Sequence, residues 1–491
     1  MSNIPLRLYP RPRIAERQDG EFFFGKKVYL HIPKGFVDHD QIKLFRELFS
    51  NFTAGLSRLV VVANDWDVNG AVLSNEREQG NCISDDREEM DYCLYVDREK
   101  ATLLFHDKAS FSHCFCTLLS QIEVRNAKAP MLTLPVCQVR DVPVTAFRGI
   151  HVCIFPETKF DMMKKFVRMI GFTKYSHLIM EFWGTFKFRC CKGMYGPNAY
   201  SYRQVKELVR EANAFGVEVI PMLNVLGHAS QSRSIYCKHT TLDNYPGMAP
   251  IFEPDGWTWN LPNPDTVDLI HRMVRELCTV FGPGNYFHLG CDESHSYGSS
   301  RLFDGKDKTV VMYSFINGLA AELQKLGRRA MMWGDQLLNE PGRFDSDNCI
   351  TYGETPEIAR MLLDNLDKSI IITDWQYYVQ KPDIPTASFL RENGFDVILA
   401  PCTDIPGLKA CAGDVVRHNY MGFLQTTWAG LHGYDTRVIQ RGATYAWEGD
   451  VDLLKMDTEF IGFETASYFR RLMPPGKDYY FSGIKEKQIE V

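Results

Sequence analysis

Short apolar runs alternate with amphipathic segments along the chain from about residue 147 onward. Each run has the length of a strand, and the segments between them repeat apolar residues at the 3.6-residue period of a helix. Between the third and fourth runs, for example, Ile270, Met273, Val274 and Leu277 follow this period. The predicted strands span residues 147–154, 177–182, 217–225, 286–293, 329–335, 369–376, 396–402 and 422–428.

This alternation is typical of an α/β fold. Strands that are apolar throughout belong to a parallel sheet that helices cover on both faces. Eight strand–helix units in roughly 300 residues predict a (β/α)8 TIM barrel. An open, doubly wound sheet is the alternative, and it is disfavoured because no glycine-rich phosphate-binding turn follows the first strand.

The part of the chain before the barrel predicts a smaller α/β unit. Residues 26–33 and 58–63 are strand-like, and the stretch between them repeats apolar residues at helical spacing. Residues 92–106 predict a β-hairpin. We therefore expect an α/β accessory domain at residues 1–140, followed by a catalytic barrel domain at residues 141–491.

Composition narrows the range of partners. The 491 residues carry a formal net charge of -6 without a long basic run, which argues against a nucleic-acid partner because phosphates require clustered Lys and Arg. No apolar stretch is long enough to span a bilayer, so no membrane partner is expected. The 14 cysteines lack the spacing of a disulfide framework, and no secretory leader is visible. These features predict free thiols and a cytoplasmic location.

Polar and tryptophan side chains stand near the end of nearly every predicted barrel strand. Barrel enzymes carry their catalytic groups at the carboxyl ends of the strands, so these side chains should converge on one rim. They are Arg148, Glu181, Asn224, His228, Asp292, Glu293, Trp333, Asp335, Asp374, Trp375, Gln376, Asp404 and Trp428.

The adjacent acids Asp292 and Glu293 suggest sugar chemistry. Cleavage of a glycosidic bond needs a proton donor for the leaving oxygen and a second group that stabilises the positively charged sugar centre. Neighbouring residues on a strand point to opposite faces, so both acids reach one substrate only if the backbone turns there. Such an arrangement suits hydrolysis in which the 2-acetamido oxygen of the sugar is the nucleophile. Glu293 would be the general acid/base, and Asp292 would hold the acetamide N–H and stabilise the developing charge.

Several stretches resemble the family 20 glycoside hydrolases, the β-N-acetylhexosaminidases. "HLGCDES" is similar to that family's His-x-Gly-Gly-Asp-Glu signature, and the likeness extends to "RGIHV", "PMLNVLGHAS", "WGD" and "TTWAG". It covers residues 147 to 450, and the preceding α/β unit resembles the accessory domain of the family. A cysteine in place of the second glycine, together with Glu181 at the second strand, looks more like the hexosaminidase D branch, which is nucleocytoplasmic in animals and favours N-acetylgalactosaminides.

The resemblance also implies roles for individual residues. It implies that Arg148 hydrogen-bonds the hydroxyls of the terminal sugar and that His228 supports the acid. It further implies an acetamide pocket walled by tryptophans. The wall residues are Trp333, Trp375 and Trp428. Glu181, Asp335 and Asp404 are additional candidates for substrate contacts, with a structural or supporting role as the alternative for the two aspartates.

The sequence departs from the family pattern at the second strand, where the motif of two Asp before a Gln-Gly-Trp is absent and Glu181 is the nearest acid, and at two later positions. Cys402 stands where the family has a tyrosine that holds the acetamide oxygen. That tyrosine is therefore either missing or supplied from elsewhere, with Tyr377 or Tyr378 as candidates. Gly430 stands where the family often has an acid that binds sugar hydroxyls. These departures affect how the sugar is anchored.

We therefore predict an exo-β-N-acetylhexosaminidase that removes terminal β-linked GalNAc or GlcNAc with retention, through an oxazoline intermediate. Its partner is a glycan or glycoconjugate, a homodimer is compatible with this prediction, and no metal or organic cofactor is needed. Two alternatives stay open: a glycan-binding barrel without turnover, and a hydrolase of the same family for a modified hexosamine or a disaccharide unit.

Overall fold

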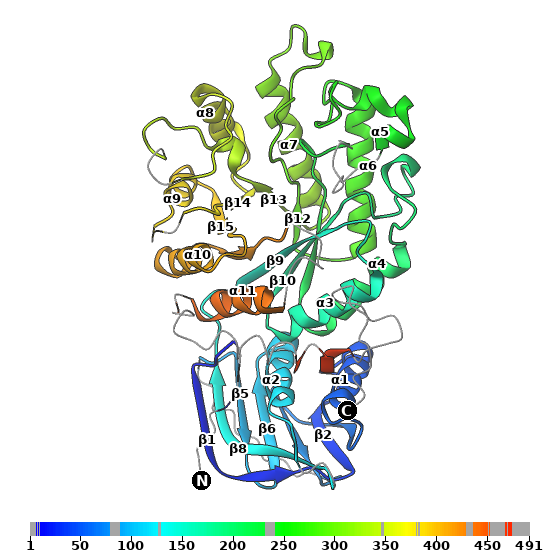
Figure 1. Ribbon diagram of the computed structural model, residues 1–491, viewed down its shortest axis with the longest axis vertical. Coiled ribbons are helices and arrows are strands. Elements are labelled where there is room, and N and C mark those ends of the chain that lie inside the picture. The colour runs from blue at the N-terminus through cyan, green and yellow to red at the C-terminus, as the bar shows by residue number, and fades with distance from the viewer. Residues whose placement is uncertain are drawn as a thin grey trace, which may run out of the picture.

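A computed structural model describes most of the chain and shows an eight-stranded barrel joined to a smaller sheet domain (Figure 1). The described residues are 6, 8, 10–78, 89–125, 129–230, 241–344, 348–379, 381, 383–428, 436–449, 451, 467–468 and 470–473. Among these residues, no helix combines the length and the apolar character needed to cross a membrane.

The N-terminal domain is a mixed sheet with two helices on one face. The strands run in the order β1-β8-β5-β6-β4-β2-β3, with β7 paired to β8. All pairs are antiparallel except β2 with β3. The strands are β1 (Ile14–Phe23), β2 (Lys27–Pro33), β3 (Arg58–Asn64), β4 (Gly70–Ser74), β5 (Tyr92–Val96), β6 (Lys100–Phe105), β7 (Glu123–Arg125) and β8 (Met131–Asp141). The predicted strands and the hairpin of this domain are confirmed.

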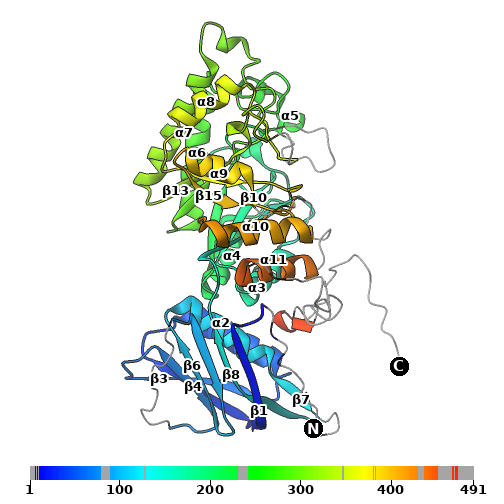
Figure 2. The ribbon, with the colours of Figure 1, turned by 90° about the vertical axis from the view of Figure 1, so that its left-hand side faces the viewer.

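Helices α1 (His39–Phe52) and α2 (Lys108–Ser120) lie between this sheet and the barrel (Figure 2). The apolar residues at helical spacing in α1 are buried, and the ring of Phe45 packs edge-on against Phe111 and Phe115 of α2.

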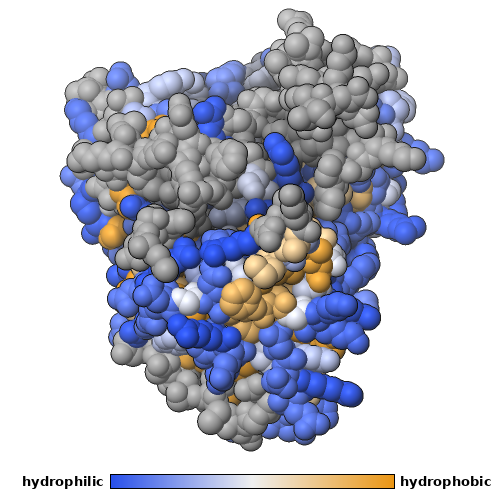
Figure 3. All heavy atoms as spheres, turned by 60° about the horizontal axis from the view of Figure 1, so that its bottom comes forward, coloured by the Kyte–Doolittle hydropathy of each residue, from blue (hydrophilic) through white to orange (hydrophobic). Residues whose placement is uncertain are grey.

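The end of the molecule that this domain forms is largely hydrophilic, with hydrophobic side chains gathered in one area (Figure 3). Exposed apolar residues of its strands include Phe23, Val124 and Met131.

The second domain is a closed barrel of eight parallel strands, as predicted. Its order is β10-β11-β12-β13-β14-β15-β16-β9. The strands are β9 (Phe147–Ile154), β10 (His177–Phe182), β11 (Glu218–Met222), β12 (Tyr286–His288), β13 (Arg329–Trp333), β14 (Ile371–Asp374), β15 (Asp396–Leu399) and β16 (Gly422–Gln425). Each lies within a predicted strand, and several end earlier than predicted because the polar residues after them turn away into loops.

Helices follow the strands around the barrel (Figure 1). They are α3 (Phe160–Phe172), α4 (Tyr202–Ala214), α5 (Thr241–Asn244), α6 (Pro264–Phe281), α7 (Lys308–Lys325), α8 (Pro356–Asn365), α9 (Pro385–Glu392), α10 (Ile405–His418) and α11 (Thr436–Glu448). Short 3-10 turns are η1 (Lys192–Met194), η2 (Pro246–Ile251), η3 (Arg301–Phe303) and η4 (Asp335–Leu337).

The apolar residues of the barrel divide into an inner and an outer set. Phe147 and Ile179 belong to a cluster with inward residues from the other strands, whereas Ile150 and Val152 pack in the larger core that includes the helices. Successive residues of a strand point to opposite faces. The odd-numbered residues of β9 and β10 therefore face the barrel interior.

A buried polar network joins the two domains. Lys174, which follows α3, donates through Nζ to Asp141 Oδ2 at 2.9 Å and to the hydroxyl of Tyr92 at 2.8 Å. The indole of Trp447 in α11 donates to Asp141 Oδ1 at 3.0 Å. Because each of these buried polar groups has a partner, the network avoids the cost of burying an unpaired charge. β8 ends at Asp141 and β9 begins at Phe147; the division into domains near residue 140 stays a prediction.

Candidate active site

The backbone turns sharply where the adjacent acids follow β12. Gly290, Cys291 and Glu293 have φ angles of 69°, 74° and 45°, in the left-handed region. Non-glycine residues adopt this region rarely, and such strain is concentrated at functional sites. Neighbouring residues of a regular strand would point to opposite faces. Because of this turn, both carboxylates instead reach one imidazole. His228 Nε2 lies 3.3 Å from Asp292 Oδ2 and 3.3 Å from Glu293 Oε2.

The two acids differ in their surroundings. The side chain of Asp292 is 6% exposed and that of Glu293 is 29% exposed. Asn224, in the loop after β11, donates to Asp292 through Nδ2 and accepts from the backbone N–H of Cys291 through Oδ1 at 3.1 Å. Asn224 thus holds both the carboxylate and the turn that presents it. The buried acid suits a fixed anion, and the more exposed acid suits exchange of protons with substrate and water.

Asp335, the first residue of η4, lies behind this pair. Its Oδ2 accepts from the backbone N–H of Glu293 at 3.1 Å, and its Oδ1 accepts from the indole of Trp375 at 3.1 Å. Burial and the neighbouring charge of Asp292 raise the pKa of Asp335 to about 7, against the lowering effect of these hydrogen bonds. Asp335 therefore links Trp375 to the turn that carries Asp292 and Glu293, which we call the acid turn.

The raised pKa of Asp335 makes stability depend on pH. In the folded protein this carboxyl keeps its proton up to about pH 7, whereas in the unfolded chain it loses it near pH 4. The folded state binds more protons within this window, so ionisation lowers the free energy of unfolding as pH rises through it. We expect the wild type to lose stability relative to Asp335→Asn between about pH 4 and about pH 7. Urea unfolding of both proteins across the window measures the difference, and a constant difference would contradict the pKa.

Aromatic side chains from β13, β14 and β16 gather beside the acids. The ring of Trp333, the last residue of β13, lies 5.5 Å from the ring of Trp428, three residues past β16. Trp375 lies 5.2 Å from Tyr377. The indole N–H of Trp428 donates to the hydroxyl of Tyr377, and Thr426 also donates to this hydroxyl at 3.3 Å. Trp333, Trp375, Tyr377 and Trp428 together form an aromatic wall that also carries hydrogen-bonding groups.

Tyr377 and Tyr378 were both candidates for the tyrosine that the family pattern places at the seventh strand. Tyr377 is the one whose hydroxyl lies in this wall, and the charge of Asp292 is among the causes that, after burial, raise its pKa well above the usual range. Tyr378 is 65% exposed. Gly430 lies outside the described residues.

A long loop between η2 and α6 adds a residue to which the sequence analysis assigned no role. The ring of Trp257 lies 4.4 Å from that of His228, and its indole donates to the backbone carbonyl of Glu293 at 2.5 Å. Trp183, just past β10, lies 6.3 Å from the His228 ring. Two aromatic rings thus lie beside His228. No local pattern identifies Trp257, because its role depends on where the loop folds back; Asn224, by contrast, was recognisable as a polar residue after a strand.

The prediction that Arg148 contacts the sugar is wrong. Arg148 is the second residue of β9, at the amino end of the strand, whereas the acids follow the carboxyl end of β12. Its guanidinium is buried, donates to the carbonyls of Thr145 at 2.8 Å and Lys174 at 3.1 Å, and lies 4.8 Å from the ring centre of Trp447. Burial lowers its pKa to about 10 against the charges of Asp91 and Asp141 in the N-terminal domain. Arg148 belongs to the domain junction.

For two further predicted residues, the contacts that the structure shows are with other groups. Asp404 is exposed, and its Oδ2 accepts from the backbone N–H of Gly407 at 2.9 Å as the N-cap of α10. Glu181 lies in β10 and contacts His151 and Cys153 of β9. The structure thus brings His228, Trp333, Asp335, Trp375, Tyr377 and Trp428 to the acids and assigns other contacts to Asp404 and Glu181.

Comparison with known proteins agrees with this architecture. Residues 170–428 match the model of the catalytic domain of glycosyl hydrolase family 20. The lacto-N-biosidase of Bifidobacterium bifidum is 23% identical over 42% of this chain and 19% of its own length. Hexosaminidase D of Bos taurus is 25% identical over 29% of this chain and 42% of its own length. The chain thus spans about a fifth to two fifths of these relatives.

A solved structure extends the likeness of fold over nearly the whole chain. The β-N-acetylhexosaminidase of Bacteroides fragilis superposes with a TM-score of 0.67 at 16% identity, over 95% of this chain and 96% of that one. The family match covers more than half of the chain and includes the acid turn after β12. This chain therefore belongs to glycosyl hydrolase family 20.

Proposed function

We propose that this protein is an exo-acting β-N-acetylhexosaminidase that removes terminal β-linked GalNAc or GlcNAc by substrate-assisted, retaining hydrolysis. The observation that carries the proposal is the placement of Asp292 and Glu293 at 3.3 Å from the same nitrogen of His228. This arrangement supplies a fixed anion and a proton-exchanging acid on one side of the aromatic wall. Family membership supports a glycosidic substrate, and the relatives named hexosaminidase support an N-acetylated sugar.

In the first step, the carboxyl of Glu293 donates its proton to the glycosidic oxygen while the bond from C1 to that oxygen breaks. The acetamide oxygen of the same sugar attacks C1 and closes an oxazolinium ring. Asp292 accepts a hydrogen bond from the acetamide N–H and stabilises the positive charge that spreads over this ring. The short distance within one sugar makes the attack intramolecular, which removes most of its entropic cost.

In the second step, the carboxylate of Glu293 takes a proton from water, and the water oxygen attacks C1. The oxazolinium ring opens, the acetamide is restored, and the product keeps the β configuration after two inversions. His228 contacts both acids and so holds the two carboxylates in position relative to each other. The rings of Trp257 and Trp183 lie beside the imidazole and help to keep it in place through both steps.

The aromatic wall provides the pocket for the acetamide group. Trp333, Trp375 and Trp428 offer flat apolar faces for its methyl group, and the hydroxyl of Tyr377 offers a hydrogen bond to its oxygen. Asp335 positions Trp375 through its indole hydrogen bond. The absence of Arg148 from the site means that other residues hold the hydroxyls of the sugar, and the choice between GalNAc and GlcNAc depends on them. The cytoplasmic location remains part of the proposal.

A panel of chromogenic glycosides tests the proposal. Nitrophenyl β-GalNAc and β-GlcNAc should be cleaved, whereas the matching β-galactoside and β-glucoside, which lack the acetamide nucleophile, should not. Turnover of the glycosides without an acetamide at a similar rate would refute the substrate-assisted mechanism. Binding of N-acetylated glycans without any turnover would instead identify a glycan-binding barrel.

The match to a lacto-N-biosidase keeps a disaccharide-releasing hydrolase as the second candidate. A nitrophenyl disaccharide in which the N-acetylhexosamine carries the nitrophenyl group distinguishes this candidate from the exo-acting enzyme. Release of an intact disaccharide, with no cleavage of the monosaccharide glycosides, would favour this second candidate over the exo-acting enzyme.

A further inference from the structure

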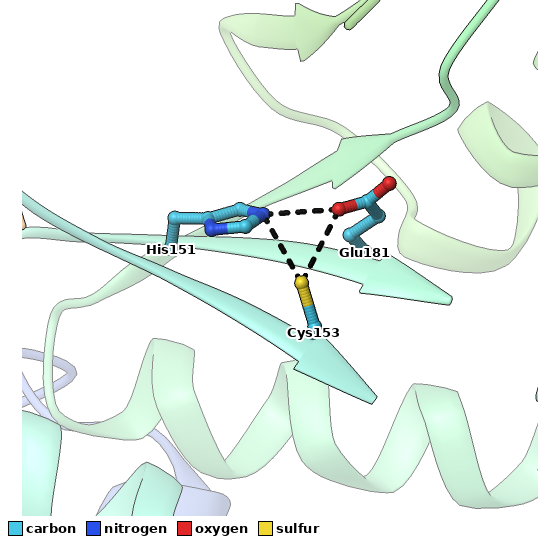
Figure 4. A group of neighbouring side chains, drawn as sticks. All are labelled: His151, Cys153 and Glu181. Carbon is cyan, nitrogen blue, oxygen red and sulfur yellow. Dashed lines mark hydrogen bonds and ion pairs between the residues drawn. The ribbon is translucent and has the colours of Figure 1, made fainter. Parts of the chain in front are cut away.

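Three side chains of different ligand chemistry meet inside the barrel, beside the aromatic wall. They are His151 and Cys153 of β9 and Glu181 of β10 (Figure 4). His151 Nε2 lies 3.2 Å from Glu181 Oε2, Cys153 Sγ lies 3.4 Å from the same oxygen, and the sulfur lies 3.9 Å from the imidazole nitrogen. One nitrogen, one sulfur and one oxygen thus form a compact triangle.

The strand geometry builds this triangle. Residues two apart on a strand point to the same face, so His151 and Cys153 both face the barrel interior, as Phe147 does. Cys153 is the register partner of Glu181 on the neighbouring parallel strand, which places the third side chain on the same face. All three residues are at most 1% exposed. The positions are therefore set by β-sheet pairing and do not depend on a mobile loop.

The separations match those between ligands of a tetrahedral zinc ion. Zinc binds nitrogen and oxygen at about 2.0–2.2 Å and sulfur at about 2.3 Å, so adjacent ligand atoms of a tetrahedral site lie about 3.4–3.6 Å apart. The three observed separations differ from these values by a few tenths of an ångström. A small adjustment of the side chains would complete the geometry.

We propose that His151, Cys153 and Glu181 bind one Zn²⁺ ion. The soft thiolate disfavours Mg²⁺ and Ca²⁺, which prefer oxygen ligands. A thiolate and a carboxylate together carry two negative charges, which the ion neutralises in this buried position. Three protein ligands leave a fourth position for water. Binding requires the thiol to lose its proton, so affinity increases with pH.

The ion would support the wall of the sugar pocket. The ring of His151 lies 4.6 Å from that of Trp428 and 5.7 Å from that of Trp333. Coordination through Nε2 fixes the plane of this imidazole and so restricts the two indoles packed on it. The zinc is separate from the acid pair and takes no part in the proposed hydrolysis. Because it binds only the folded barrel, it should also raise the melting temperature.

Titration of the full chain, stripped of metal by a chelator, tests the proposal. The wild type should bind one equivalent of Zn²⁺ tightly in the barrel, and Co²⁺ in its place should show a thiolate-to-cobalt charge-transfer band. Cys153→Ser should abolish this band and weaken Zn²⁺ binding by more than the roughly 10–100-fold that loss of an outer-shell partner causes. Zinc should raise the melting temperature of the wild type and not that of Cys153→Ser.

Two controls remove other metal-binding groups. The adjacent thiols Cys190 and Cys191 are changed together to serine. His418→Ala breaks a cluster with the exposed Asp383 and the buried Asp414 that could hold a cation. Neither change should affect the cobalt band. Zinc binding that survives Cys153→Ser but is lost in either control would show adventitious binding only and overturn the proposal.

A second variant covers the case in which Cys153→Ser does not fold. Glu181→Gln keeps the size of the side chain and removes its charge, and it should weaken Zn²⁺ binding while leaving a folded protein. X-ray diffraction at the zinc edge of wild-type crystals should show one anomalous peak between the three ligand atoms. Absence of this peak in zinc-loaded crystals would exclude the site.

Discussion

Glu293→Gln is expected to lower kcat/KM, which reports the first step, by about 10²–10⁴-fold for a natural glycan substrate, the usual contribution of a general acid. The loss should be much smaller for a nitrophenyl glycoside, because nitrophenolate leaves without needing a proton. The position of Glu293 supports this role, since its side chain is the more exposed of the two acids and still contacts His228. Steady-state kinetics on a series of aryl glycosides of increasing leaving-group pKa measures the difference.

A matched variant separates this effect from a general loss of acid side chains. Glu357, in the first turn of α8, is exposed. Glu357→Gln should therefore leave the kinetics of every substrate unchanged. An equal loss of kcat/KM in Glu293→Gln for good and poor leaving groups would show that Glu293 does not donate the proton. The acid would then have to be sought among the other groups around His228.

Asp292→Asn should lower kcat by about 10²–10³-fold for good and poor leaving groups alike, the loss seen when a group that stabilises transition-state charge is removed. The replacement removes the anion that faces the oxazolinium charge. It also places an amide against the donating Nδ2 of Asn224. The insensitivity to leaving group distinguishes this variant from Glu293→Gln, because Asp292 acts on the sugar and not on the departing oxygen.

An inhibitor supplies an independent measurement for Asp292. An N-acetyl thiazoline resembles the cyclised intermediate, so it should bind the wild type more tightly than the substrate does. Asp292→Asn should lose most of this advantage, while Glu293→Gln should retain more of it. Unchanged thiazoline affinity in Asp292→Asn would mean that Asp292 does not contact the acetamide.

The zinc proposal and the hydrolase proposal can fail separately. Loss of zinc binding would leave the acid turn intact, because the ligands lie on β9 and β10 and the acids follow β12. Conversely, an inactive protein with the cobalt band would still hold the metal.

The alternation of apolar runs and amphipathic segments was sufficient to predict the barrel, because strand and helix periods are local properties of the chain. The acid pair at the end of the fourth run was equally visible, since buried charges at a strand end are costly unless they are used. The amino-end position of Arg148 also follows from the sequence, as the second residue of its run, and the structure shows that this position decides its contacts.

Only the tertiary structure decided which distant residues act together. The shared contact of His228 with both acids requires three left-handed residues in the acid turn, and Trp257 reaches His228 only because a long loop folds over it. The His151–Cys153–Glu181 triangle depends on the register between β9 and β10. Periodicity indicates which face of a strand or helix a residue occupies. Closure of the barrel and the paths of its loops bring those faces together, and no local sequence pattern encodes this closure or these paths.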